Sequence, residues 1–171
     1  MLYELIFCRV IDSFLHYISE ILMLIFKTRP EMLKSSEKIS IDEIFDYPTR
    51  EELLSALTER KVIALSFKGL VELHNDLTSK LDFALFLRSE DFERGRVLVE
   101  QRNLVVHNRG CVNRRYLERV PTAKIPIGDK LKFSVEPVMD DLAFLGTCLR
   151  DIDQRAEEKF GIIRKTPGIV Q

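Results

Sequence analysis

The sequence lacks several features that mark common functional classes. Its 171 residues contain no Gly-rich phosphate-binding loop, no internal repeat and no low-complexity tract. The three cysteines, Cys8, Cys111 and Cys148, are odd in number and show no C-x-x-C spacing. We therefore expect reduced thiols in a cytoplasmic protein, and neither a disulfide framework nor a zinc site.

Met1–Thr28 is strongly apolar but lacks an uncharged run long enough to cross a membrane. Its longest uncharged run is Ser13–Ser19, whereas a helical span needs about 20 apolar residues. Its start at Met1 without a leader is also consistent with a natural N-terminus slightly upstream. Apolar residues at helical spacing predict a long core helix that ends before Arg29-Pro30, with this buried stripe: Phe7, Ile11, Phe14, Ile18, Leu22 and Ile25.

Length and composition predict one globular domain. With 46% hydrophobic and 31% charged residues, the chain can build one real core and is short for two. Charge is uneven, because residues 93–132 hold ten Arg or Lys against four acids, a net charge of +6 that leaves −7 for the rest. This cationic segment suits a phosphate backbone. A solvated face paired with acids from other helices would give the same counts.

Capping and turn residues divide the rest of the chain into further helices. Thr49 with Glu52 three residues later forms a capping box at the start of one of them. We predict an all-α, up-and-down bundle of about four to six helices over residues 1–161 and a flexible tail at 162–171. The other predicted elements are short turns at Pro30–Ser35 and Ile41–Phe45, a break at Phe67–Gly69, a helix over Leu70–Leu81, a helix capped by Ser89 and closed by Gly110, a short helix at Val112–Val120, an extended piece at Lys130–Phe133, and a last helix from Ser134 to Gly161.

Three further expectations concern single positions. Gly95 lies inside a predicted helix, where glycine costs about 1 kcal/mol relative to alanine; it indicates either close approach by another helix or a second subunit, or a tolerated surface glycine. His74, among polar neighbours, is interpreted as a surface histidine. In the last helix the inward positions are expected to be Val138, Leu142, Leu145 and Leu149.

The segment Glu100–Gly110 is the strongest candidate for function. His107 falls in the final turn of its predicted helix, where free carbonyls and the helix dipole favour the imidazolium. It is therefore a candidate proton donor or acceptor near neutral pH. Arg102 and His107 diverge by about 140° around an ideal helix, whereas Asn103 and His107 share a face.

An Arg followed at this interval by His is weak evidence on its own, since about one such pair is expected by chance in this composition. Arg9 and His16 show a similar interval inside the apolar N-terminal helix, and we interpret that pair as coincidence. The weight of the Arg102–His107 pair comes from its context: a polar residue directly after the arginine, a helix end at the histidine, and the cationic run that follows.

With that context, the segment Arg102-Asn103-Leu104-Val105-Val106-His107-Asn108-Arg109-Gly110 resembles the signature of the HEPN superfamily of small helical ribonucleases and toxins. The order of predicted elements is also similar to HEPN from about residue 1 to about residue 161. The resemblance implies a twofold homodimer with an RNA cleft at its interface. It also implies metal-independent cleavage without a cofactor, in a defence or toxin–antitoxin setting.

Under this resemblance the residues around the motif take specific roles. His107 removes the proton from a ribose 2′-OH or protonates the leaving 5′-oxygen. Arg102 binds the scissile phosphate, and Asn103 orients the histidine or bonds to the phosphate. The products are a 2′,3′-cyclic phosphate and a 5′-hydroxyl, and no cluster of acids near the motif could hold Mg²⁺. Residues expected to bind RNA, with the tyrosine stacking on a base, are Asn108, Arg109, Arg114, Arg115 and Tyr116.

The sequence departs from one HEPN pattern. Some HEPN toxins carry a tyrosine two residues after the histidine, which a nucleotidyltransferase antitoxin modifies; here that position is Arg109. The modification switch is therefore not expected, and the candidate partner proteins are another antitoxin or a defence-system component. Two alternatives are a non-catalytic HEPN-like dimerisation or RNA-binding module and an unrelated helical scaffold in which Arg102 and His107 are structural.

Overall fold

The computed structural model of the protein describes residues 2–33 and 38–162. Within them it contains seven α-helices and no β-strand, which confirms the all-α class. The number of helices exceeds the predicted range because Ile41–Phe45, predicted as a short turn, is a helix of five residues. The elements are α1 Leu2–Thr28, a 3-10 turn Pro30–Leu33, α2 Ile41–Phe45, α3 Arg50–Ser66, α4 Leu70–Leu81, α5 Ser89–Asn108, α6 Arg114–Arg119 and α7 Val135–Phe160.

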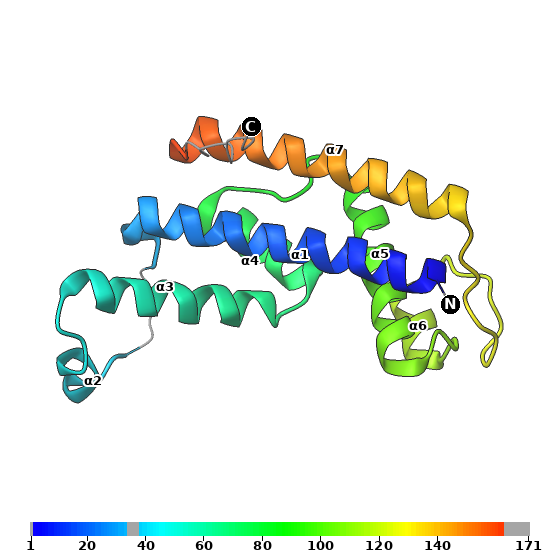
Figure 1. The fold of residues 1–171 in the computed structure, drawn as a ribbon, viewed down its shortest axis with the longest axis horizontal. Helices are drawn as coiled ribbons and strands as arrows, with labels where there is room; N and C mark the ends of the chain where they lie inside the picture. The colour runs from blue at the N-terminus through cyan, green and yellow to red at the C-terminus, as the bar shows by residue number, and fades with distance from the viewer. Residues whose placement is uncertain (1, 34–37, 163–171) are drawn as a thin grey trace, which may run out of the picture.

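Helix α1 is the centre of the bundle and lies between α3 and α7 (Figure 1), with α5 also packed against it. Every residue of its predicted apolar stripe is buried, Ile11 and Ile25 completely. Full burial of one such side chain contributes about 1.5–3 kcal/mol, so α1 supplies much of the energy of the main core. None of the helices in the described segments combines the length and apolarity of a membrane span.

Several helix ends lie where the sequence predicts them. The Thr49 hydroxyl accepts a hydrogen bond from the Glu52 N–H at 3.2 Å, which confirms this N-cap. Gly69, with φ of +81°, joins α3 to α4. The N-cap of α5 is one residue earlier than predicted, at Arg88. Of the predicted tail, Ile162 is buried against the main core and residues 163–171 lie outside the described segments, as do Lys34 and Ser35 of the predicted Pro30–Ser35 turn.

Gly95 is buried against the segment that connects α4 to α5. A Cβ atom at this position would lie 2.7 Å from Cζ of Phe86, a buried residue of that connection. The close neighbour is thus a side chain of the same chain. Gly95 therefore accommodates Phe86, and not a second helix or a second subunit as expected. The alternative, a tolerated surface glycine, is also wrong because Gly95 is buried.

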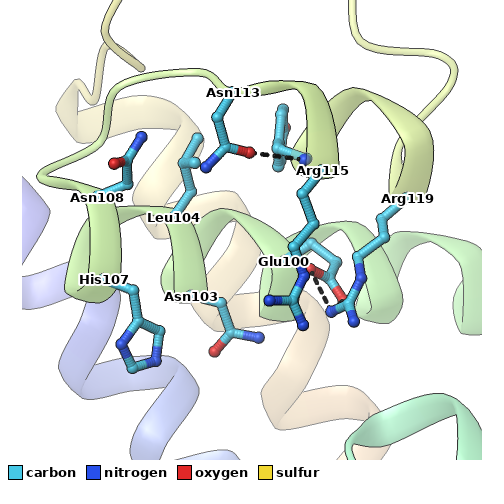
Figure 2. A pocket seen from close by; sticks show the side chains of 9 residues that line it. Glu100, Asn103, Leu104, His107, Asn108, Asn113, Arg115 and Arg119 are labelled. Atoms are coloured by element: carbon cyan, nitrogen blue, oxygen red, sulfur yellow. Dashed lines mark hydrogen bonds and ion pairs between the residues drawn. The ribbon is translucent and has the colours of Figure 1, made fainter.

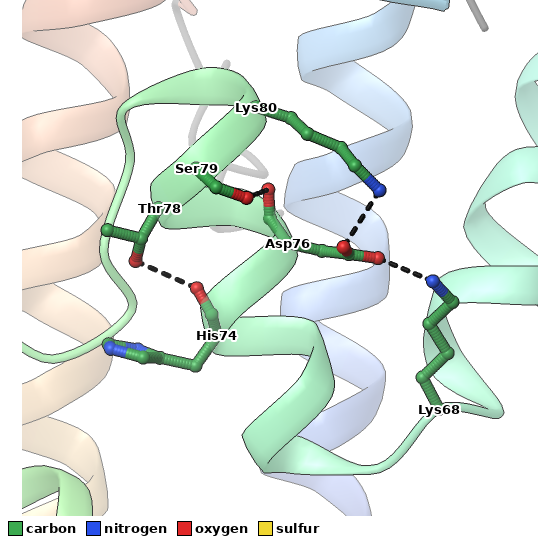
Figure 3. A network of polar contacts seen from close by, with 6 residues as sticks. All are labelled: Lys68, His74, Asp76, Thr78, Ser79 and Lys80. Atoms are coloured by element: carbon green, nitrogen blue, oxygen red, sulfur yellow. Dashed lines mark hydrogen bonds and ion pairs between the residues drawn. The ribbon is translucent and has the colours of Figure 1, made fainter. Parts of the chain in front are cut away.

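Two other expectations also fail. His74 is half-buried, with its ring centroid 4.4 Å from that of Phe92, and this burial lowers its pKa. Figure 3 shows its carbonyl accepting from Thr78 beside a polar network in which Asp76 pairs with two lysines. Leu142, predicted to face inward, is 44% exposed, although Val138 and Leu145 of the same helix are buried. The helical period of α7 is right, but the face that contacts the core is displaced from Leu142 toward Cys148, which is buried.

A second, smaller hydrophobic cluster lies where α5 and α6 meet. Its buried members come from α5, α6 and the loops around α6, and they are Leu104, Val112, Tyr116, Val120 and Leu131. The predicted extended piece at Lys130–Phe133 is reduced to one antiparallel bridge between Cys111 and Lys130. Backbone bonds from Val112 to the Asp129 carbonyl at 2.8 Å and from Leu131 to the Gly110 carbonyl at 2.9 Å fasten this loop to the end of α5. The cluster thereby fixes α6 against the motif.

Candidate active site at the end of α5

The backbone at the end of α5 stops the helix directly after the motif. Arg109 adopts a left-handed conformation with φ of +54°, and Gly110 follows with φ of +74°. The Leu104 carbonyl accepts hydrogen bonds from the N–H groups of both residues. Gly110 therefore lies beyond the helix end as predicted, but the first left-handed residue is Arg109, at a cost of about 1–2 kcal/mol for a residue with a Cβ atom.

A cleft with a cavity of about 380 Å³ lies between α5 and α6. In Figure 2 the side chains of His107, Asn103 and Arg115 point to the same open side of α5. His107 and Arg115 are exposed. The residues that line the cleft are Glu100, Asn103, Leu104, His107, Asn108, Asn113, Arg115, Tyr116 and Arg119.

The spacing of these residues explains why they meet. Glu100, Asn103 and His107 are three and four residues apart, so they lie on one face of α5 over two turns. Arg115 and Arg119 are four residues apart and share a face of α6. The two polar faces meet because α6 folds back over α5 on the small hydrophobic cluster.

An ion pair joins the two helices across the cleft. Arg119 Nη1 donates to both Glu100 carboxylate oxygens, at 2.9 and 3.2 Å. The Arg119 side chain is 45% exposed and that of Glu100 17%, so solvent screening limits the contribution of the pair to about 1 kcal/mol or less. Within the described residues, His107 and Arg115 have neither a hydrogen-bond nor an ion-pair partner. Their polar atoms can therefore bind a ligand.

Arg102 is directed away from the cleft, as its angular separation from His107 on α5 predicts. Its Nη2 lies 2.7 Å from Oδ1 of Asp12 on α1, and its Nη1 donates to the Asn103 side-chain oxygen at 3.1 Å. The Nε atom is buried without a partner in the described structure. Arg102 thus lies away from His107, and its guanidinium holds the side-chain oxygen of Asn103 through a hydrogen bond.

The other predicted RNA-binding residues divide between the cleft and the surface around it. Asn108 lines the cleft, but its side chain donates to the Cys111 carbonyl. Arg109 and Arg114 are exposed and do not line the cleft. Tyr116 is only 4% exposed, and burial raises the pKa of its hydroxyl. So little of its ring is accessible that the predicted stacking on a base is disfavoured.

Three polar residues of the cleft are missing from the sequence prediction: Glu100, Asn113 and Arg119. Glu100 could be found from its spacing to His107, which places both on one face of α5. Asn113 is the N-cap of α6 and accepts from the Tyr116 N–H at 2.9 Å, a role that its position before a short helix also signals. Arg119 could be found from its spacing to Arg115, four residues away on the same face of α6, but whether that face meets the cleft depends on how α6 packs on α5.

Among the described residues, no group of three or more His, Cys, Asp or Glu side chains is arranged to hold a metal ion. Comparisons of the chain with protein-family models, with curated proteins and with solved structures gave no match. The resemblance to HEPN therefore stays a prediction that depends on the Arg102–His107 segment and the helical layout.

Proposed function

We propose that the protein is a metal-independent endoribonuclease that cleaves RNA by attack of a ribose 2′-hydroxyl on the adjacent phosphate. The observation that carries this proposal is the exposed His107 at a cleft that also contains Asn103 and two guanidinium groups. An imidazole transfers protons near neutral pH. Guanidinium groups bind phosphate oxygens and stabilise the charge that develops on them in the transition state.

The position of Arg102 changes the role we propose for it. The predicted contact with the scissile phosphate would require its release from Asp12, which is 2.7 Å away. In the arrangement observed, Arg115 is the guanidinium that can reach a phosphate in the cleft, with Arg119 beside it. Arg102 instead holds the Asn103 oxygen, which leaves the amide N–H groups of Asn103 to donate to the phosphate.

We further propose a twofold homodimer that places two such clefts near one RNA. The starts of α1 and α7 lie at the same end of the bundle as α6 (Figure 1), and this end exposes large apolar side chains, which is typical of an association surface. They include Leu2 and Leu5 of α1, Val106 of α5, and Val135 and Met139 of α7, each at least 44% exposed. The proposed cytoplasmic defence or toxin–antitoxin setting rests on the HEPN resemblance alone.

A second candidate function is a non-catalytic RNA-binding or dimerisation module. The ion pair between Arg102 and Asp12 favours this alternative, because it withdraws one member of the predicted catalytic pair from the cleft. Such a module would bind RNA through Arg115 and the surrounding basic residues without cleaving it.

Cleavage of end-labelled RNA in excess EDTA tests the proposal, with His107→Ala as the test variant and His16→Ala as the matched control. His16 is exposed on α1 and lines a different cavity. We expect the wild type and His16→Ala to cleave equally, and His107→Ala to be slower by about 10²–10⁴-fold. Urea denaturation of each variant verifies that a loss of cleavage does not result from a loss of folding stability.

Equal cleavage by His107→Ala and the wild type would contradict the proposal, as would complete loss of cleavage in EDTA. RNA binding without cleavage by any of the three proteins would instead support the binding module.

A further inference from the structure

Cleavage through a 2′-hydroxyl requires two proton transfers. One group must remove the proton of the attacking 2′-oxygen, and another must protonate the leaving 5′-oxygen. His107 can perform one of these steps. Among the residues that line the cleft, the one carboxylate that can accept a proton is that of Glu100.

The spacing of Glu100 and His107 fits opposite ends of one phosphodiester. They are seven residues apart, which places them on the same face of α5 with their Cα atoms about 10.5 Å apart along the axis. Both side chains line the same cleft, so a phosphodiester that lies along this face of α5 can contact both groups. Asn103 lies between the two residues on that face, where the phosphate would be.

The ion pair with Arg119 does not prevent Glu100 from accepting a proton. Arg119 reaches both oxygens through the single nitrogen Nη1, whereas an ionised carboxylate has about four lone-pair sites. The other charged or titratable groups near Glu100 are Arg96 on α5, with Arg115 and Tyr116 on α6. On the α1 side, Asp12 is already paired with Arg102.

We infer that Glu100 is the general base and His107 the general acid, so that each chain holds a complete acid–base pair in its own cleft. This inference rests on the proposed ribonuclease function. The Glu100 carboxylate takes the proton of the 2′-hydroxyl while the 2′-oxygen forms a bond to phosphorus. The bond from phosphorus to the 5′-oxygen breaks, and the imidazolium of His107 protonates that oxygen.

The products are a 2′,3′-cyclic phosphate and a 5′-hydroxyl, and the cycle closes when Glu100 returns its proton to water and His107 takes one up. Arg115 neutralises the non-bridging oxygens, whose charge increases in the transition state. Arg119 holds the base in position. A second copy of the chain can then contribute RNA-binding surface, but the chemistry does not require one of its residues.

The pH dependence of kcat tests the role of Glu100, with Glu118→Gln, an exposed residue of α6 outside the cleft, as the matched control. A base and an acid acting together give a bell-shaped profile. We expect Glu100→Gln to lower kcat by about 10²-fold or more and to lose the acid-side limb. Glu100→Asp should restore part of the rate together with that limb, and Glu118→Gln should match the wild type.

A Glu100→Gln variant with the wild-type rate, or with a uniformly lower rate and both limbs intact, would overturn the inference. If His107→Ala is inactive in the same assays, the proposed ribonuclease function nevertheless stands. If the wild type itself does not cleave, or His107→Ala cleaves equally well, the proposed function fails.

Mixing two inactive variants tests whether the pair belongs to one chain. Glu100→Gln and His107→Ala carrying different tags are co-expressed, and the mixed species is isolated through both tags where one forms. We expect no more activity than the two variants show separately, because every cleft then lacks either its base or its acid. Recovery of a substantial fraction of wild-type activity would place the base and the acid on different chains and would contradict the inference.

Discussion

The main core and the small cluster beneath α6 differ in size and in what they support. The main core buries side chains of α1, α3, α4, α5 and α7 and includes fully buried residues such as Ile11 and Ile152. The small cluster has five buried members and lies directly below the polar cleft. This difference indicates that overall stability depends on the long helices, whereas the geometry of the candidate site depends on a few residues at one end.

The largest effect on stability is expected from Ile11→Ala in the main core. Ile11 is completely buried, so its truncation should lower the free energy of unfolding by about 2–5 kcal/mol. Ile63→Ala is the control, since Ile63 on α3 is 47% exposed and should change stability by about 0.5 kcal/mol or less. Urea denaturation measures both, and similar losses would contradict the assignment of the core.

Two glycine substitutions should have opposite signs. At Gly95, a Cβ atom would lie 2.7 Å from Phe86, so Gly95→Ala should destabilise the protein by about 1–3 kcal/mol of overpacking, less up to about 1 kcal/mol of improved helix propensity. At Gly146 in α7, no described atom beyond its chain neighbours and the adjacent backbone of its own helix lies within 4 Å of the added Cβ. Gly146→Ala should therefore stabilise the protein by up to about 1 kcal/mol. If thermal denaturation shows that both substitutions change stability in the same direction, Phe86 does not restrict position 95.

Val112→Ala should destabilise the small cluster without destabilising the main core. Val112 is 2% exposed in the small cluster, and removing its methyl groups should lower the local free energy of opening by about 1–2 kcal/mol. Amide hydrogen exchange in α6 should accelerate while that of α1 stays unchanged, as expected for units that open independently. Equal acceleration in both helices would show that the two cores unfold together.

The smallest effect concerns His74 and pH. Burial lowers its pKa below the ordinary value of 6.5, so the unfolded chain binds a proton more readily than the folded one. Stability should therefore fall as pH decreases below about 6.5, by less than 1 kcal/mol because the ring is only half-buried. Urea midpoints at pH 7.5 and 5.5 should differ more for the wild type than for His74→Phe. Equal differences would show that His74 does not contribute to the pH dependence.

Local signals in the sequence predict most of the fold. The stripe of α1, the Thr49 cap and the glycines after α5 and α7 are each specified by a few neighbouring residues, and the structure has them where predicted. Positions that depend on distant residues were predicted less well. Phe86 packs onto Gly95 from a connecting segment, and aromatic side chains cover His74; neither contact leaves a periodic pattern in the sequence.

The candidate site shows the same division. The periodicity of α5 places Asn103 and His107 on one face and Arg102 on another, and it also accounts for Glu100. Arg102 pairs with Asp12 on α1, and Arg119 lies over the cleft, because of how the helices pack. Spacing along one helix does not determine this packing. A motif therefore predicts which residues share a face of its helix, while the packing of the other helices determines what that face meets.

The chemical ends left on RNA cleaved in excess EDTA test the central claim most directly. Attack by the 2′-hydroxyl in the His107 cleft predicts a 2′,3′-cyclic phosphate on one fragment and a 5′-hydroxyl on the other, and no cleavage where the attacking ribose is replaced by 2′-deoxyribose. Fragments with 5′-phosphate ends, or equal cleavage at the deoxy position, would mean that water and not the 2′-hydroxyl attacks the phosphate. That result would contradict the account.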